Sequence, residues 1–367
     1  MIPYSRQEIN SKDIKSVIEV LKSDFITQGK KVPEFENKVK KLVNAKFATA
    51  VNSATSGLHI ACIALGLGKN DKLWTSPISF VASSNVALLC GANVEFVDIN
   101  PSTNNMCIRN LEKMLKSAKK NNSLPKIVMP VHMAGQSCEM KEIHKLSKLY
   151  GFRIIEDASH AIGGKYKNSF IGSCKYSDAV VFSFHPVKII TTGEGGMVLC
   201  KKKSINDKLL LLRNHGITRD KDKLKKKNVG QWHYEQHILG YNYRMTDFQA
   251  ALGISQLKRI NSFIKARNKI ANRYNKFLKN LPLKLPTVSK NCISTFHLYI
   301  IRLNLEKIKK SHKEVFSILR KRGINVNLHY IPIHYHPFYK ELLPQNLNLI
   351  ESERYFNEAI SIPIYPK

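Results

Sequence analysis

The stretch that decides the fold is "FSFHPVKIITTGEGG", residues 182–196. It starts as an apolar strand, carries one lysine, Lys188, and ends in a glycine-rich turn. A lysine held among apolar neighbours loses proton affinity, because burial disfavours its ammonium form. The neutral amine is a nucleophile toward carbonyl groups, so this position can carry covalent chemistry with an aldehyde. A single lysine beside a glycine turn is more often a surface residue, so the assignment depends on the rest of the chain.

Around this stretch, short β-branched runs alternate with segments of helical periodicity. Strands are expected at 47–53, 72–76, 93–99, 126–131, 152–157, 179–184 and 196–200. Helices are expected between them at 54–67, 80–91 and 138–151. Strands separated by helices predict an α/β fold with a mostly parallel, seven-stranded sheet covered on both faces.

A second section follows one long helix predicted over 246–270. It contains a strand at 294–304, a helix at 312–324 and a strand at 324–334. These elements predict a smaller α+β C-terminal domain. The expected division is an N-terminal segment, 1–25, that joins the small domain, a large cofactor-binding domain at 26–258, and the small domain at 259–367.

The charge of the chain is strongly positive. Of 367 residues, 59 are basic and 27 are acidic, which gives a formal charge of +32. Such an excess could indicate a nucleic-acid partner, or it could attract an acidic small molecule such as a nucleotide sugar. The lysines are dispersed and are not interleaved with stacking aromatic residues, so we expect a solvated basic surface and no nucleic acid.

Several sequence patterns that would indicate a membrane, secretion or a bound metal are missing from the chain. The chain has no apolar run of membrane-spanning length and no signal-peptide pattern at its start, so we expect a cytoplasmic protein without membrane contact. Its seven cysteines form no CxxC pair, which favours reduced thiols and no metal site.

Asp157 ends the apolar strand "FRIIED", where α/β sheets place ligand-binding groups. Its carboxylate could cap a helix, bind a metal or pair with a protonated ring nitrogen. Asp157 and Lys188, on separate strands of one sheet, fit a pyridoxal phosphate site. Lys188 would bind the aldehyde and Asp157 would keep the pyridine nitrogen protonated.

A phosphate cradle is predicted at "NSATSGL", residues 52–58. Ala54, Thr55 and Ser56 lie where a strand turns into a helix, and the N–H groups of a helix start bind anions. Ordinary capping by Ser53 or Thr55 would give the same pattern.

Three further residues could meet the cofactor. Ser183, five residues before Lys188, could add a phosphate hydroxyl. Phe80 could stack on the ring or belong to the core. His160, three residues after Asp157, could face the ring or fill a polar corner.

Together these motifs resemble a known family. "NSATSGL", "SPISFVAS", "EDASHAIGG", "FSFHPVK…TTGEGG", "LRNHGI", "GYNYRMTDFQAALGISQLKRI" and "LHYIPIH" occur in one order over essentially the whole chain. This order is similar to that of the DegT–StrS sugar-nucleotide aminotransferases, which are pyridoxal phosphate enzymes of fold type I, the aspartate aminotransferase-like fold. "SPISFVAS" and "DASHAIGGKY" most resemble members of the pseudaminic acid pathway.

The resemblance implies a role for each matching residue. Lys188 matches the cofactor-binding lysine, Asp157 the partner of the ring nitrogen, His160 the residue beside the ring, and Phe80 the stacking aromatic. Ala54, Thr55, Ser56 and Ser183 match phosphate-binding positions. Asn242 matches a phosphate ligand donated by a second subunit, which implies a homodimer. His185, His215, His329 and Tyr330 lie in segments that border the sugar-nucleotide pocket.

The implied reaction moves an amino group from glutamate to the 4-keto carbon of a UDP-linked 4-keto-6-deoxy-N-acetyl sugar. Some family members carry histidine in place of the lysine and remove a hydroxyl, so Lys188 favours amino transfer. Alternatives are another keto sugar nucleotide, such as GDP-4-keto-6-deoxymannose, or a nucleic-acid-binding or regulatory protein on the same fold. Relatives usually continue past "SIPIYP" into a closing helix, so the end at Lys367 predicts a truncated small domain.

Overall fold

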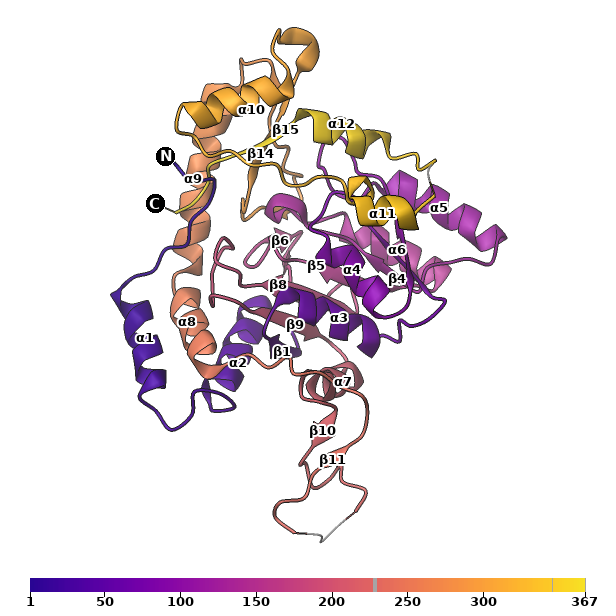
Figure 1. Cartoon of the computed structure of the whole chain (residues 1–367), viewed down its shortest axis with the longest axis vertical. Coiled ribbons are helices and arrows are strands. Elements are labelled where there is room, and N and C mark those ends of the chain that lie inside the picture. Colours follow the sequence, from indigo (N-terminus) through magenta and orange to yellow (C-terminus); the bar gives the residue numbers. More distant parts are fainter. Residues whose placement is uncertain (227–229, 345, 367) are drawn as a thin grey trace.

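A seven-stranded sheet forms the centre of the computed structural model, which describes residues 1–226, 230–344 and 346–366 (Figure 1). Its order is β1-β9-β8-β5-β4-β2-β3. The strands are β1 (Phe47–Val51), β2 (Lys72–Thr75), β3 (Asn93–Phe96), β4 (Ile127–Met129), β5 (Arg153–Asp157), β8 (Ala179–Ser183) and β9 (Gly196–Cys200). All neighbours pair in parallel except β9, which is antiparallel to both β1 and β8. The predicted mostly parallel α/β sheet is confirmed.

The reversed direction of β9 follows from the stretch around Lys188. Parallel neighbours need a crossover, usually a helix, whereas an antiparallel neighbour needs only a returning loop. Residues 184–195 contain no helix, so the chain leaves β8 and returns directly beside it.

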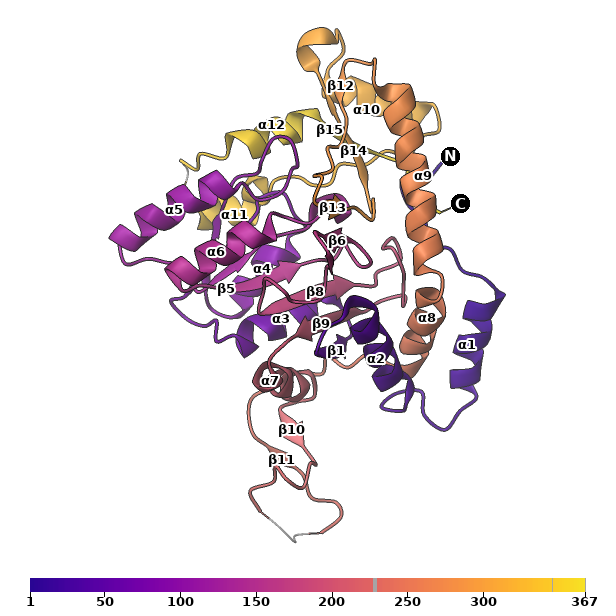
Figure 2. The ribbon, with the colours of Figure 1, turned by 180° about the vertical axis from the view of Figure 1, so that it is seen from behind.

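Helices cover both faces of the sheet, so the strands are buried on both sides (Figure 2). In β8, Ala179 and Val181 pack in a core with α3 (Ala54–Ala64), α4 (Ala82–Leu89) and α7 (Lys203–Arg213). Val180 and Phe182 pack on the opposite face with α2 (Lys31–Val43) and α8 (Asp247–Leu257). Towards β3, that second face is covered by α5 (Ile108–Lys120) and α6 (Met140–Tyr150).

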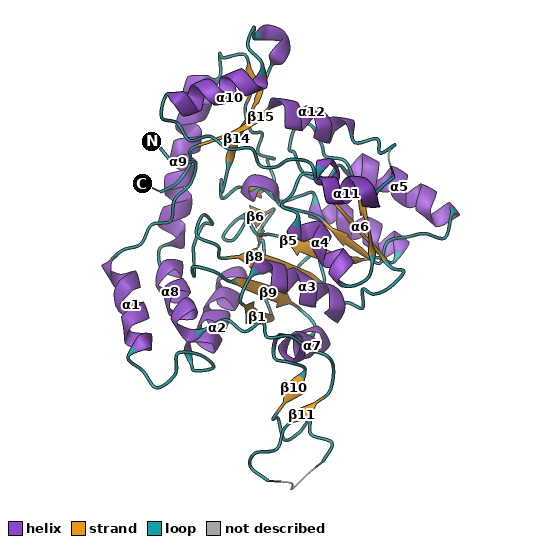
Figure 3. Ribbon diagram, in the orientation of Figure 1, coloured by secondary structure: helices purple, strands orange, loops and turns teal. Residues whose placement is uncertain are grey.

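A second group of elements follows α8 in the chain. A three-stranded sheet, β12-β14-β15, consists of Leu283–Lys284, Tyr299–Leu303 and Ala359–Ile362. It shares a core with α9 (Ile260–Leu278) and α10 (His312–Lys321). The chain then forms α11 (Pro337–Leu342) and α12 (Ile350–Glu358) (Figure 3).

The remaining elements are short. A small sheet joins β6 (Lys165–Tyr166), β7 (Ser169–Phe170) and β13 (Cys292–Ile293). The hairpin of β10 (Ile217–Thr218) and β11 (Glu235–Gln236) projects away from the rest of the chain (Figure 1). Single 3₁₀ turns lie at Met133–Gly135, Leu305–Lys307 and Ile333–Tyr335.

The N-terminal segment contacts both groups of elements. Ile2 pairs with Ile324, and Tyr4 accepts a hydrogen bond from the N–H of Ile364. Helix α1 (Ser11–Leu21) instead packs against α8. The predicted small domain ends at Lys367, which lies outside the described residues, as do residues 227–229 of the lysine-rich run.

The single long helix predicted over 246–270 is wrong. The chain forms two helices, α8 and α9, and Arg259 between them has φ −107° and ψ 5°. The side chain of Arg259 donates to Glu8 at 2.8 Å and also to Asp13. These contacts hold the junction against the N-terminal segment, which local periodicity could not indicate.

The strand predicted at 324–334 is also wrong. Asn327 forms one isolated bridge with Ser361, and residues 333–335 form a 3₁₀ turn. Pro332 has no N–H to donate to a ladder, which argues against a continued strand.

No helix among the described residues combines the length and the apolar composition needed to cross a membrane. All seven cysteines are free thiols.

Candidate active site

A cavity of about 640 Å³ lies where the carboxyl ends of β5 and β8 meet the start of α3. This is the edge at which α/β sheets bind ligands. It is lined by ten of the predicted site residues: Ala54, Thr55, Phe80, Asp157, His160, Ser183, His185, Lys188, His329 and Tyr330. The structure therefore brings together positions that are up to 276 residues apart in the chain, from Ala54 to Tyr330.

Asp157 is the last residue of β5, and its carboxylate is held by two serines. Ser83, on α4, donates to Oδ2 at 2.7 Å. Ser159 donates to Oδ1 through its hydroxyl at 2.6 Å and through its N–H at 3.1 Å. Asp157 is buried, so these bonds fix the direction in which the carboxylate faces the cavity.

Lys188 lies on the loop between β8 and β9, and this loop is closed at its base. The N–H of Phe184 donates to Gly195 at 2.9 Å, and the N–H of Thr192 donates back to Phe184 at 3.0 Å. Burial lowers the pKa of Lys188 to about 8, and the nearby charge of Asp157 offsets part of this effect. The amine is therefore partly unprotonated near neutral pH, as a nucleophile or a base requires.

The start of α3 offers an anion site. The side chain of Ser53 accepts from the N–H of Ser56 at 3.1 Å, and its carbonyl accepts from Gly57 at 3.1 Å. No described residue accepts from the N–H groups of Ala54 and Thr55, which line the cavity. Donors of this kind, at the positive end of a helix, bind phosphate.

Gly196 allows the strand β9 to approach this helix start. A Cβ on Gly196 would lie 2.7 Å from the N of Ala54 and 2.7 Å from the C and O of Ser53. Any side chain here would displace the cradle, so the glycine at the end of the "TTGEGG" turn is a requirement of the site.

Three imidazoles form another wall. The rings of His160 and His297 lie 4.3 Å apart between centroids, and Nε2 of His160 lies 3.1 Å from the hydroxyl of Tyr330. Burial, followed by the charge of Lys188, lowers the pKa of His160 well below its ordinary value. Burial likewise lowers the pKa of His329 to about 4. These rings are therefore neutral near pH 7 and can donate or accept hydrogen bonds without adding charge.

Three of the predicted site residues do not line the cavity. The hydroxyl of Ser56 lies 2.9 Å from that of Ser53, behind the helix start. His215 and Asn242 lie on the segment that carries the projecting hairpin, and both are exposed. Asn242 forms an isolated bridge with Asn214, so this segment returns close to the body of the chain.

The structure adds lining residues that the sequence did not single out. They are Tyr4, Asn52, Ser79, Glu194 and His297, among others. Asn52 begins the "NSATSGL" motif and Glu194 lies in "TTGEGG". Their position next to predicted site residues could therefore have identified them as lining residues. Tyr4 and His297 come from distant segments, and nothing local marks them.

The cavity fits pyridoxal phosphate at each of its functional parts. Lys188 supplies an amine for the aldehyde, Asp157 a carboxylate for the ring nitrogen, and Ala54, Thr55 and Ser183 supply donors for the phosphate. Among the described residues, Oδ1 of Asn52 and Nδ1 of His160 are buried without a hydrogen-bond partner, which leaves polar atoms for a ligand. The fold and the site define a pyridoxal phosphate-dependent transferase of fold type I.

Comparison with known proteins places the chain within this class. Residues 7–367 match the DegT/DnrJ/EryC1/StrS aminotransferase family, and the chain belongs to that family. The resemblance expected from the motifs is confirmed, and so are the fold and the pyridoxal phosphate cofactor of the family.

Three relatives illustrate the similarity. The UDP-4-amino-4,6-dideoxy-N-acetyl-beta-L-altrosamine transaminase of Campylobacter jejuni is 40% identical over 366 residues, covering 100% of this chain and 93% of the relative. Helicobacter pylori PseC, described as an aminotransferase involved in the biosynthesis of pseudoaminic acid, superimposes with a TM-score of 0.88 at 32% identity, covering 100% of this chain and 94% of PseC. Spr1654 of Streptococcus pneumoniae in its PLP form, described as a "putative sugar aminotransferase", gives a TM-score of 0.87 at 28% identity, covering 99% of this chain and 93% of Spr1654.

Proposed function

We propose that the chain is a sugar-nucleotide aminotransferase that moves an amino group from glutamate to the 4-keto carbon of a UDP-linked 4-keto-6-deoxy-N-acetyl sugar. The observation that carries this proposal is the meeting of Lys188 and Asp157 in one cavity beside an anion site. The Campylobacter and Helicobacter relatives, whose names refer to this pathway, support the choice of substrate.

Lys188 and Asp157 are the residues that we expect to act directly on the cofactor and the substrate. Lys188 binds the cofactor aldehyde and, once released, takes and returns the proton at the substrate carbon through Nζ. Its lowered pKa suits both directions of this transfer. Asp157 holds the ring nitrogen, and Ser83 and Ser159 keep its carboxylate oriented. When bound, pyridoxal phosphate supplies an electron sink that lets the substrate carbon give up its proton.

The remaining assigned contacts hold the ligands in place. Ala54, Thr55 and Ser183 bind the phosphate, with Ser56 supporting the helix start from behind. Phe80 and His160 flank the ring. His185, His329 and Tyr330 face the nucleotide sugar, and His215 lies in a segment that borders the same pocket. The basic surface raises the local concentration of the anionic substrates.

The active unit is proposed to be a homodimer. The described residues that line the cavity include one cation, Lys188, whereas the ligands bring several phosphates. Asn242 is exposed and lies outside the cavity of its own chain, which suits a donor that completes the cradle of the second copy. Dimers of identical chains with a twofold axis place each such residue at both sites.

The test is product analysis of the purified protein with glutamate, pyridoxal phosphate and matched 4-keto-6-deoxy sugars linked to UDP or to GDP. We expect amination of the UDP-linked N-acetyl sugar at C4, read by mass spectrometry and NMR. Amination of the GDP-linked sugar alone would reject the proposed substrate and retain the reaction class. Salt-sensitive DNA binding without any cofactor absorbance would instead favour a nucleic-acid-binding protein.

A further inference from the structure

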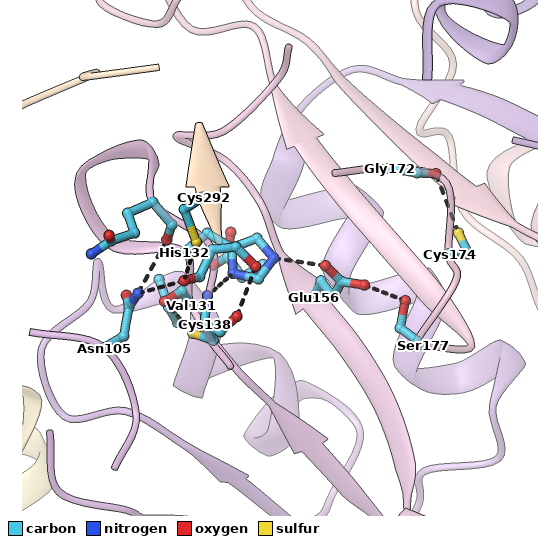
Figure 4. Close-up of polar contacts among 12 residues, drawn as sticks. Asn105, Val131, His132, Cys138, Glu156, Gly172, Cys174, Ser177 and Cys292 are labelled. Carbon is cyan, nitrogen blue, oxygen red and sulfur yellow. Dashed lines mark hydrogen bonds and ion pairs between the residues drawn. The ribbon is translucent and has the colours of Figure 1, made fainter. Parts of the chain in front are cut away.

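A buried polar network lies on the face of β5 opposite Asp157, and the proposed reaction does not use it. Glu156 precedes Asp157, and successive side chains of a strand point to opposite faces. Nε2 of His132 lies 2.7 Å from Oε2 of Glu156, and Ser177 donates to Oε1 at 2.5 Å (Figure 4). Both oxygens of a buried carboxylate are thus bound within the chain.

A backbone contact determines the proton position on His132. The N–H of Cys138 donates to Nδ1 of His132 at 3.1 Å (Figure 4). An N–H group can only donate, so Nδ1 must accept, and the ring proton lies on Nε2. The ring is therefore neutral and donates to Glu156, which makes the pair a directed hydrogen bond.

The same segment holds the backbone of Asp157. The N–H of His132 donates to the carbonyl of Asp157 at 3.0 Å, and the N–H of Asp157 donates to the carbonyl of Pro130 at 3.0 Å. His132 is thus attached to the end of β5 twice, through its backbone to Asp157 and through its ring to Glu156. These bonds fix the position of the Asp157 backbone, while the serines on the cavity side fix its carboxylate.

We propose that Glu156 and His132 are positioning residues that hold Asp157 in place from the reverse face of the sheet, with Ser177 as their support. This inference rests on the proposed role of Asp157 in binding the cofactor ring. The bonds at Glu156 act on the reaction through Asp157 alone, since neither Glu156 nor His132 lines the cavity.

Two substitutions of Glu156 separate positioning from charge. In Glu156→Gln, the amide oxygen can accept from His132 and the amide nitrogen can donate to Ser177, whose hydroxyl accepts equally well. All bonds are then kept and only the charge is lost, so we expect the Kd for pyridoxal phosphate to stay within about twofold of the wild type. In Glu156→Ala both bonds are lost, and we expect the Kd to rise about tenfold, as for other residues that orient a ligand-binding group.

The full-length apo protein is titrated with pyridoxal phosphate, and the visible absorption of the complex is followed against pH. We expect Glu156→Ala to displace the pH midpoint of that absorption, because the ring nitrogen is held less well, and Glu156→Gln to restore it. Asp98→Ala is the matched control: Asp98 is a buried carboxylate that accepts from the N–H of Glu351 at 2.9 Å and from the N–H of Ser352 at 3.0 Å, and it does not line the cavity. It should lower the Tm without changing the Kd or the pH midpoint.

Ser177→Ala provides a second test that can be used if Glu156→Ala does not fold. It removes one bond only, and we expect the Kd to rise about threefold. Combined with Glu156→Gln it should raise the Kd further, because the amide nitrogen then has no acceptor.

The inference is overturned if folded Glu156→Ala, or Ser177→Ala with Glu156→Gln, binds pyridoxal phosphate with the wild-type Kd and pH midpoint. A wild-type chain that binds no pyridoxal phosphate would reject the proposed function itself, so the two failures are distinguishable.

Discussion

The cavity and the projecting hairpin are built in contrasting ways. The carboxylate of Asp157 accepts from two serines of the same chain, and the loop that carries Lys188 is closed by backbone bonds. The hairpin segment leaves large apolar side chains in solvent, with Trp232 74% exposed and Leu239 77% exposed. A single chain therefore fixes the chemical centre by itself, whereas the hairpin has the composition of a surface that meets another molecule.

The strongest test of this contrast is Lys188→Ala. Without the amine, we expect amino transfer to fall by about a thousandfold or more and the visible absorption band of the bound cofactor to be lost. Lys203→Ala, at an exposed lysine paired with Asp207, is the control and should retain both. A Lys188→Ala protein that kept the band and the turnover would show that another residue does this work.

The next largest effect is on the stability of the fold, because folding buries the amine of Lys188 away from water. Its pKa is 10.5 in its ordinary state and about 8 in the folded chain. Between these values the unfolded chain binds more protons, so the free energy of unfolding increases as pH rises from 8 to 10.5. The expected gain is about 3 kcal/mol relative to Lys188→Met, measured by urea unfolding of both apo proteins at several pH values. If the free energy of unfolding changed with pH by the same amount in the wild type and in Lys188→Met, this prediction would be wrong.

Asp157→Asn should lower kcat/KM by about a hundredfold, because a neutral amide stabilises charge on the ring nitrogen poorly. Steady-state kinetics with saturating cofactor measures this. Asp178→Asn is the control at the opposite end of β5, where Asp178 accepts from the N–H of Ile154 at 3.0 Å. Its kcat/KM should match the wild type, and equal losses in the two variants would reduce Asp157 to a structural role.

The smallest effect concerns the hairpin segment. Asn242→Ala should raise the Kd for pyridoxal phosphate about tenfold, through a site on the second subunit. When Asn242→Ala and Lys188→Ala chains are mixed and allowed to exchange at a pyridoxal phosphate concentration too low to fill the Asn242→Ala site, half of the dimers are hybrids with one intact site, so activity should recover to about a quarter of the wild type. No recovery, with dimers present by light scattering, would place Asn242 in the site of its own chain.

The sequence predicted the sheet well because the residues that mark each strand and its end are neighbours in the chain. Apolar strands that end in polar residues, such as "FRIIED", mark both the strand and the ligand-binding edge. The strand and the glycine turn around Lys188 likewise follow one another in the chain.

The predictions failed where distant segments determine the local structure. Arg259 separates two helices because it binds the N-terminal segment, about 250 residues away. The strand expected at 324–334 depended on β-branched residues, whereas in the structure His329 and Tyr330 face the cavity. His297 enters the site next to His160 only through tertiary packing, so no local pattern could reveal it.

The antiparallel pairing of β1 with β9 also has a consequence during synthesis of the chain. Phe47 pairs with Cys200, so this strand has no neighbour until about 150 further residues have left the ribosome. The edge that will border the cofactor cradle stays open meanwhile to chaperones and to other nascent chains. Translation speed between these two strands should therefore influence the yield of native enzyme.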